Sequence, residues 1–165
     1  QELIDKLITK NAKNFIILAA DPAEGVEEKI GYASADIMLY AQELGLNTWW
    51  VGASFNKDAV KKECPNHTVY GVISIGYGEE QGTVHHSKDD FEVCSYEGEA
   101  PQWFKDGVEY ALMAPTAFNR QSFYIKGKGN TVHFEYKAGE FQGIDTGLVK
   151  YHFEAAAGKE NFEWA

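Results

Sequence analysis

The feature that most constrains the fold is a long amphipathic pattern between residues 26 and 44. Gly45 follows the pattern where helices commonly end in a left-handed residue, and Leu46 can supply the apolar contact that accompanies such an ending. A long helix is therefore predicted, and the rest of the chain must offer a surface for it to pack against. Its predicted apolar face recurs at three- and four-residue steps and consists of Ile30, Ala33, Ile37, Ala41 and Leu44.

Apolar runs on both sides of this helix predict strands. Residues 15–20 form a continuous run of six apolar side chains, which is typical of a strand buried on both faces. Residues 68–77 are interpreted as a second buried strand. Farther along, residues 122–126 and 131–136 read as two strands, and the glycine-rich connection between them suits a hairpin.

The order of the predicted helices and strands places the chain in the α+β class. Because helices and strands do not alternate regularly, we expect a small mixed, mostly antiparallel sheet flanked by helices. No internal repeat divides the sequence, so residues 1–165 are interpreted as a single domain. Further helices are predicted at residues 2–11, 57–63, 101–114 and 145–157, an aromatic strand at 47–53, a loop at 78–90 and a short extended segment at 91–96.

The charge and the cysteine content limit which partners the protein can bind and in which compartment it is expected. The chain has 15 Lys and Arg against 25 Asp and Glu, a net charge of −10, which argues against nucleic acid and anionic membranes as partners. No stretch approaches the roughly 20 apolar residues that a membrane span needs. Cys64 and Cys94 form no C-x-x-C pair, which favours a reducing, cytoplasmic location. The histidines and cysteines lack metal-ligand spacing, so no metal site is predicted.

The segment from Ala114 to Gln121 places an amide, a guanidinium and a second amide on three consecutive residues. Such a loop can offer several hydrogen-bond donors and acceptors to an aromatic heterocycle with carbonyl and imine edges. The alternative is an ordinary turn, because Pro and Asn favour turns and Arg120 could pair with a carboxylate.

A second unusual segment runs from Leu44 to Ala53. Small residues follow two tryptophans there, which would let a flat ligand approach the backbone closely. The alternative is that both indoles belong to the core and that Gly52 only turns the chain.

Taken together, these segments resemble the nitroreductase superfamily of FMN-dependent flavoreductases. The closest resemblance is to the branch in which a Pro-Ser-Ala-x-Asn-Arg-Gln element comes late in the chain, here with Thr116 in place of Ser. The family's Tyr-Ala-Gln-x-Leu-Gly-Leu-Gly-Thr-x-Trp-Val-Gly stretch matches residues 40–52, with Asn47 replacing a Gly. The family has a strand that ends in Ile-Gly-Tyr, which matches residues 75–77. Near its end the family has a pattern that begins with Ile-Asp-x-Gly and finishes with His-Phe, which matches residues 144–153.

The resemblance implies a flavin site. The Pro-Ser-Ala-x-Asn loop is expected to reach across a dimer interface to the edge of FMN. The Trp-Val-Gly stretch is expected to line the face of the flavin ring. A lysine after the Ile-Gly-Tyr strand is expected to hold the phosphate. Arg120 is expected to face away and to pair with a carboxylate, since neighbours on both sides of it would face the site. The implied cofactor-binding residues are Pro115, Thr116, Ala117, Asn119, Gln121, Trp50, Val51, Gly52, Ala53 and Lys88.

The activity implied by the resemblance is transfer of electrons from NADH or NADPH through FMN to nitroaromatics, quinones or similar small aromatic acceptors, in a homodimer. No side chain is expected to act as a dedicated acid, base or nucleophile, because hydride transfer is the flavin's own chemistry. The alternative is a flavin-binding homologue without turnover, or a dimeric interaction domain of the same fold. The family's opening Arg-x-Ser-x-Arg element is not found, and we expect the chain to lack its N-terminal segment.

Overall fold

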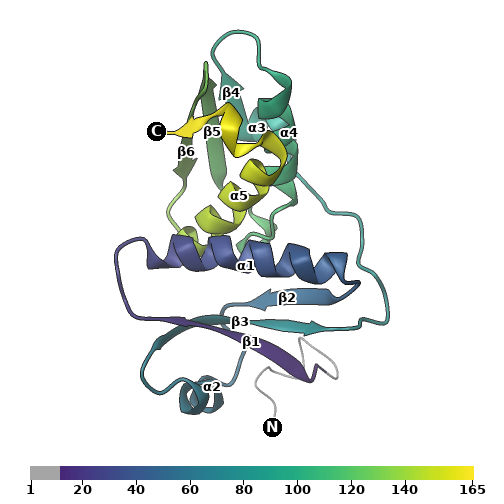
Figure 1. The fold of residues 1–165 in the computed structure, drawn as a ribbon, viewed down its shortest axis with the longest axis vertical. Helices are drawn as coiled ribbons and strands as arrows, with labels where there is room; N and C mark the ends of the chain where they lie inside the picture. Colours follow the sequence, from purple (N-terminus) through teal and green to yellow (C-terminus); the bar gives the residue numbers. More distant parts are fainter. Residues whose placement is uncertain (1–11) are drawn as a thin grey trace.

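A computed structural model describes residues 12–165, so the helix predicted at 2–11 lies outside the described residues. The α+β class is confirmed, but the strands form two sheets instead of the single sheet that was expected. Figure 1 shows the two sheets in separate halves of the molecule, with helix α1 lying across the middle. The sequence pattern located the strands but carried no information on which of them pair.

The first half is a three-stranded sheet with a helix on each face. Its strand order is β1-β3-β2, and both pairings are antiparallel. Helix α1 covers one face and helix α2 lies on the other side (Figure 1). The elements are β1 (Asn14–Ala20), α1 (Val26–Glu43), β2 (Asn47–Val51), α2 (Lys57–Glu63) and β3 (Thr68–Gly76).

The second half packs two helices against a four-stranded sheet of order β4-β5-β6-β7. The predicted hairpin is confirmed as β5 and β6, whereas β4 and β7 join the edges in parallel. Residues 91–96, expected to be extended, instead divide between the end of helix α3 and strand β4. The elements are α3 (Asp90–Val93), β4 (Cys94–Tyr96), α4 (Gln102–Met113), the 3-10 turn η1 (Ala117–Asn119), β5 (Phe123–Lys128), β6 (Thr131–Tyr136), α5 (Gln142–Ala157), the 3-10 turn η2 (Lys159–Asn161) and β7 (Glu163–Trp164).

Helix α1 ends as its sequence predicted. Gly45 has a φ of 75°, and its N–H donates to the Gln42 oxygen at 2.9 Å. The Leu46 N–H reaches back to the Ala41 oxygen, also at 2.9 Å, which completes a Schellman motif. This ending turns the chain sharply into β2 and so fixes where the tryptophans of β2 lie.

The buried face of α1 differs from the predicted one. Of the five residues expected on that face, only Ala41 is fully buried, while Ala33 and Leu44 are exposed. The residues that α1 buries are mainly small, because α5 crosses this helix closely. A Cβ added to Gly31 would fall 2.0 Å from the backbone oxygen of Ile144 in α5.

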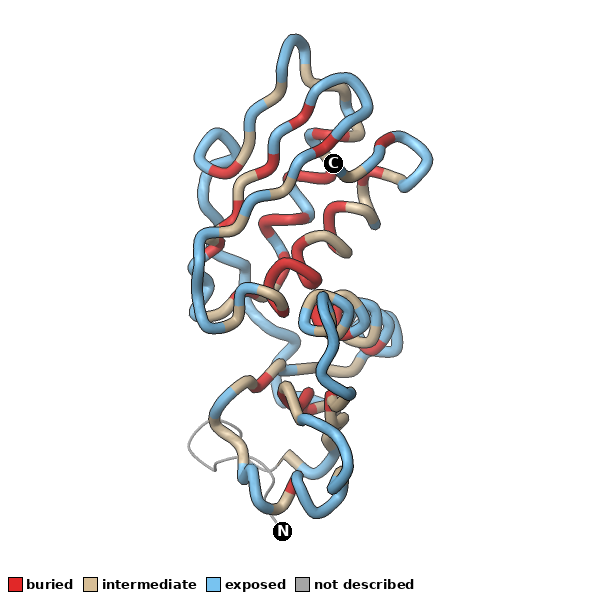
Figure 2. The backbone as a smooth tube through the Cα atoms, turned by 90° about the vertical axis from the view of Figure 1, so that its left-hand side faces the viewer, coloured by how far each residue is buried: buried red, intermediate tan, exposed pale blue. Residues whose placement is uncertain are grey.

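The main core lies in the second half, where aromatic rings pack between α4, α5 and the C-terminal segment. Phe104 and Phe153 contact edge to face with ring centroids 5.9 Å apart, and Trp103 stacks on Phe162 at 5.6 Å. Figure 2 shows the buried backbone concentrated in this half and along α5. In contrast, β1, the strand predicted to be buried on both faces, has only Leu18 fully buried, because it lies at the edge of its sheet.

Candidate functional site

The two segments singled out in the sequence meet in one cavity of about 780 Å³ at the junction of the two halves. The end of β2 and the residues after it form one wall, and the loop between α4 and β5 forms the other. Both walls belong to one chain, so no partner subunit is needed to bring them together. The cavity includes seven of the ten residues implied by the resemblance: Trp50, Val51, Gly52, Ala53, Pro115, Thr116 and Ala117.

The first wall is built on an anchored indole. Trp50 Nε1 donates to the Ser34 hydroxyl of α1 at 3.2 Å, and its ring meets the edge of Phe141 at a centroid distance of 6.0 Å. Gly52 follows, and a Cβ there would fall 2.5 Å from the Phe141 ring. The absence of a side chain at Gly52 therefore lets the Phe141 and Trp50 rings pack directly against the backbone of this wall.

The second wall is a strained loop. Three residues that are not glycine adopt a positive φ within it: Phe118 at 55°, Asn119 at 51° and Gln121 at 46°. Such conformations cost energy and persist only where surrounding contacts impose them. The Phe118 side chain, which is 81% exposed, stands at the rim of the cavity.

Hydrogen bonds hold the far end of this loop away from the cavity. Asn119 Nδ2 donates to the His86 oxygen at 2.7 Å, so this amide is directed at the neighbouring loop. Gln121 is 1% exposed, and its Nε2 donates to the Leu112 oxygen at 2.8 Å. Neither Asn119 nor Gln121 lines the 780 Å³ cavity.

Lys88 also lies apart from the cavity. Its backbone N–H donates to Gln121 Oε1 at 2.7 Å, and its Nζ donates to the Gln121 oxygen at 2.9 Å. The side chain lines a different cavity, of about 560 Å³, beside β5 and the end of β6. The role of phosphate ligand that the resemblance implies for Lys88 stays a prediction, and in this arrangement its ammonium group is bonded to the loop.

Arg120 makes a different contact from the one expected. Its guanidinium carbon lies 5.0 Å from the centroid of the Phe118 ring, a cation–π arrangement. Within residues 12–165, no carboxylate lies at ion-pair distance from Arg120, so the expected ion pair is not formed there. The left-handed conformation of Phe118 explains the difference, because it places that ring beside the guanidinium. Arg120 is not among the residues that line the site.

A buried carboxylate, which is not among the residues that the resemblance implies, also lines the cavity. Asp145 is 3% exposed, lines the cavity, and accepts hydrogen bonds from the Ala117 N–H and the Tyr136 hydroxyl. Burial raises the pKa of Asp145, while the hydrogen bonds from Tyr136 and Ala117 act in the opposite direction. The available sequence signal was its place in the Ile-Asp-x-Gly pattern. Phe141 and His85, which also line the cavity, had no such signal.

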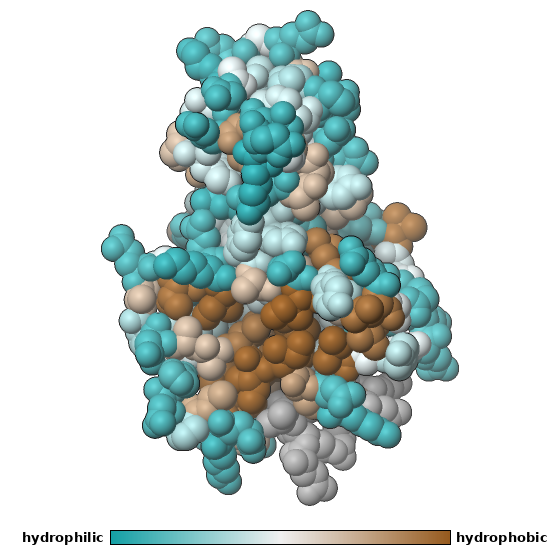
Figure 3. Space-filling view, viewed as in Figure 1, coloured by the Kyte–Doolittle hydropathy of each residue, from teal (hydrophilic) through white to brown (hydrophobic). Residues whose placement is uncertain are grey.

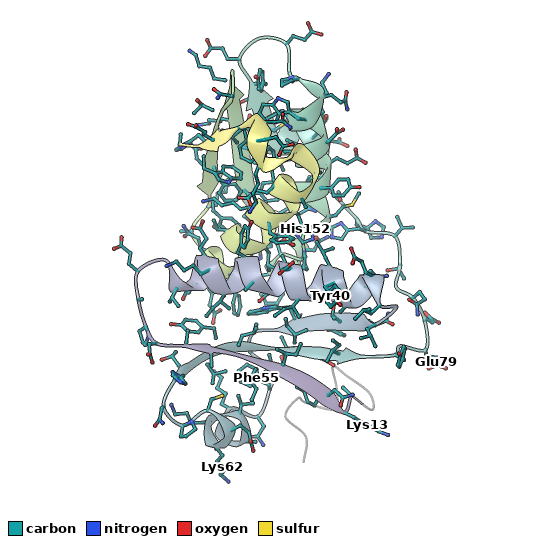
Figure 4. All side chains as sticks on the ribbon, viewed as in Figure 1. Lys13, Tyr40, Phe55, Lys62, Glu79 and His152 are labelled. Atoms are coloured by element: carbon teal, nitrogen blue, oxygen red, sulfur yellow. The ribbon has the colours of Figure 1, made fainter. Side chains whose placement is uncertain are left out.

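His152 is a histidine of the core, on helix α5. It is 6% exposed, and its Nδ1 lies 2.8 Å from the Leu148 oxygen within α5. Burial lowers its pKa, and the nearby His85 acts in the same direction. Figure 4 shows His152 on α5, close to α1. Among the described residues, no group of three or more His, Cys, Asp or Glu side chains could hold a metal ion.

The cavity therefore suits a flat, largely uncharged ring. One wall is an aromatic and glycine surface, and the opposite wall offers backbone groups of Pro115 to Ala117. No lysine or arginine among residues 12–165 lines it, and its one buried charge is the carboxylate of Asp145. A ligand with a conjugated ring system and polar edges would match this lining.

Comparison with known proteins agrees with this geometry. Residues 1–157 match the protein family described as "Putative TM nitroreductase". A crystal structure described as that of a "putative nitroreductase" from Thermotoga maritima is similar with a TM-score of 0.69 and 21% sequence identity. The match covers 88% of this chain but only 61% of that one, and at this identity it shows the fold alone. None of the curated proteins compared matches the sequence.

The chain thus belongs to this family of nitroreductase-like proteins, as the match over residues 1–157 shows. The resemblance found in the sequence is confirmed at the level of family and fold. No helix within residues 12–165 combines the length and apolar character needed to cross a bilayer.

Proposed function

We propose that this protein binds FMN with the flavin ring in the 780 Å³ cavity and transfers electrons from NADH or NADPH to nitroaromatics, quinones or similar small aromatic acceptors. The observation that carries the proposal is the meeting of two sequence segments that are far apart in the chain. The end of β2 and the Pro115–Phe118 segment line the same cavity, and both are segments through which the sequence resembles FMN-dependent flavoreductases.

The residues present fit the ring of a flavin better than its phosphate. Trp50, Gly52 and Ala53 line one side of the cavity, and backbone groups of the opposite wall can meet polar ring edges. The phosphate has no lysine or arginine among the described lining residues. We therefore assign recognition of the ring to the cavity and expect the phosphate to lie outside its walls.

The protein's part in this reaction is binding and orientation. When bound, FMN supplies the two-electron hydride chemistry, and no side chain needs to act as a nucleophile. Trp50 is held by Ser34 and Phe141, so that wall is preorganised, and the Trp50–Ala53 backbone is assigned to the ring face. Asn119 and Gln121 act by holding the second wall in place through their bonds to His86 and Leu112.

We propose further that the protein is a cytoplasmic homodimer. Cys64 and Cys94 are free thiols, which fits a reducing compartment. Apolar side chains stand exposed on α1 and β2, which fits an interface with a second copy. Nucleic acid and membrane surfaces are not among its proposed partners, given the net charge of −10.

Titration of the purified protein with FMN, followed by assays of NADH and NADPH oxidation with a nitroaromatic or quinone acceptor, tests the proposal. We expect saturable FMN binding and acceptor-dependent oxidation of at least one nicotinamide cofactor. Binding of FMN without turnover would instead favour a flavin-binding homologue. Absence of FMN binding would contradict the proposal and favour a domain that only mediates interactions.

A further inference from the structure

A buried carboxylate contacts the loop that forms one wall of the cavity. Both Asp145 oxygens lie 3.1 Å from the Ala117 backbone nitrogen, and the Tyr136 hydroxyl donates to Oδ2. Asp145 lies in the first turn of α5 and is 3% exposed. Hydrogen bonds that a buried, ionised carboxylate accepts from N–H and O–H groups are stronger than hydrogen bonds between neutral groups.

The contact falls where the loop leaves ordinary backbone geometry. Ala117 comes directly before Phe118 and Asn119, whose φ values are 55° and 51°. Three alternate residues of the loop are each fixed by a hydrogen bond: the Ala117 N–H by Asp145, the Asn119 side chain by His86, and the Gln121 N–H by the Thr116 hydroxyl at 3.1 Å. Of the three groups that accept these bonds, the Asp145 carboxylate and the Thr116 hydroxyl belong to residues that line the cavity.

We propose that Asp145, held by Tyr136, is the positioning residue of the site: through the Ala117 N–H it fixes the Pro115–Phe118 wall in the conformation that receives the ligand ring. The effect on flavin rests on the function proposed above, whereas the effect on the loop does not. The carboxylate acts on the wall and takes no part in electron transfer.

The chain offers a matched control for this arrangement. Tyr151 of α5 donates to Asp36 Oδ1 of α1 at 2.5 Å, which is also a tyrosine–aspartate contact. Asp36 is exposed and does not line the cavity. Asp36→Asn therefore removes the charge from a similar hydrogen bond without touching the wall.

The test compares Asp145→Asn and Tyr136→Phe with Asp36→Asn, using amide hydrogen exchange and FMN affinity. In Asp145→Asn we expect the Ala117 amide to exchange roughly tenfold faster and FMN to bind roughly tenfold more weakly, as expected for loss of one charge-assisted hydrogen bond. Tyr136→Phe should produce smaller changes in the same direction. Amides of Val72 and Ile73, in the other half, should exchange as in the wild type, and Asp36→Asn should leave both readouts unchanged.

Two results would overturn the proposal. One is an Asp145→Asn variant whose Ala117 amide exchanges no faster than in Asp36→Asn. The other is uniform acceleration of exchange throughout the protein, which indicates a general loss of stability. If the wild type binds no FMN, the proposed function fails, but exchange at Ala117 in Asp145→Asn and Tyr136→Phe still decides whether Asp145 positions the loop.

Discussion

Lys88 illustrates how local bonding limits what a charged side chain can do. Its backbone N–H and its Nζ both donate to Gln121, at 2.7 and 2.9 Å, so the lysine joins two loops. Its ammonium group has three N–H donors, and the one bonded to Gln121 holds the group on the side of the 560 Å³ cavity. Lys88 is therefore held apart from the cavity that we assign to the flavin ring.

We expect Lys88→Met to lower the melting temperature while changing the FMN dissociation constant less than about twofold. Loss of the bond to Gln121 should cost about 1 kcal/mol. Lys105→Met, on the exposed side of α4, is the control. Riboflavin, which has no phosphate, should bind with an affinity similar to that of FMN. A large loss of FMN affinity with unchanged riboflavin affinity would instead show that Lys88 grips the phosphate.

A second prediction at the scale of residues concerns the stability of the protein at acidic pH. Burial lowers the pKa of His152 in the folded protein, whereas the unfolded chain has a pKa of about 6.5. Below pH 6.5 the unfolded state binds a proton first, so the contribution of His152 to stability is lost as the pH falls through its folded-state pKa. Denaturant unfolding from pH 7.5 to 5 should show a steeper loss in wild type than in His152→Gln. An equal slope in the two proteins would contradict this prediction.

At the residue scale, the sequence identified the parts of the site that motifs mark. The Trp50–Ala53 and Pro115–Ala117 segments were found because their residue order is distinctive. Asp145 was missed as a site residue because burial of an acid depends on tertiary contacts, which local pattern does not contain. For the same reason, the sequence could not show that Lys88 and Gln121 bond to each other.

At the scale of elements, the crossing of α1 and α5 joins the two halves. Gly31 of α1 lies against Ile144, and Gly147 of α5 lies against Glu28, where an added Cβ would fall 2.0 Å from a backbone oxygen in each case. Lys150 adds an ion pair to Glu28 at 2.7 Å. Because the cavity has walls from both halves, the depth of this crossing sets the distance between its walls.

We expect Gly31→Ala to destabilise the protein by about 1–3 kcal/mol, the usual cost of overpacking, and to weaken FMN binding. In an open helix the same change would stabilise by about 1 kcal/mol, so the sign of the effect is diagnostic. Gly76→Ala is the control, because a Cβ there meets no atom within 4 Å. Urea unfolding measures both variants, and a more stable Gly31→Ala protein would contradict the close crossing.

The sequence predicted where most helices and strands lie, but not which faces they bury or which strands pair. Residue patterns placed α1 and its Gly45 ending, α2, and the β5–β6 hairpin close to their observed bounds. The predicted buried face of α1 was wrong because the prediction rested on the periodicity of the larger apolar side chains. The close helix contact instead selects small residues such as Gly31, Ser34 and Ala35. Separation of the strands into two sheets depends on long-range pairing, which no local pattern records.

For the whole molecule, the distribution of apolar surface favours a second copy. Figure 3 shows hydrophobic side chains gathered over the half that contains α1 and the three-stranded sheet, while the other half is mostly hydrophilic. Tyr40 and Leu44 at the end of α1 are 62% and 55% exposed, and Trp49 of β2 is 53% exposed. The many aromatic residues alone are weaker support, because the core of the second half already buries several of them.

Sedimentation equilibrium should therefore give a mass of twice 18.4 kDa at micromolar concentration. Leu44→Lys places a charge in the apolar surface and should shift the protein toward monomer. Phe91→Lys makes the same kind of change on α3, where the wild-type side chain is 72% exposed, and should leave the dimer intact. A wild-type mass of 18.4 kDa would contradict the dimer.

The central claim, that a flavin ring binds between the end of β2 and the Pro115–Phe118 wall, is tested most directly by the indole N–H resonances. The chain has four tryptophans: Trp49 and Trp50 line the cavity, whereas Trp103 and Trp164 pack against the core of the second half. In ¹⁵N–¹H spectra recorded during FMN titration, the Trp49 and Trp50 signals should shift and saturate together. The Trp103 and Trp164 signals should stay in place. Saturable shifts confined to Trp103 and Trp164, or no shifts at FMN concentrations that saturate binding, would contradict the site.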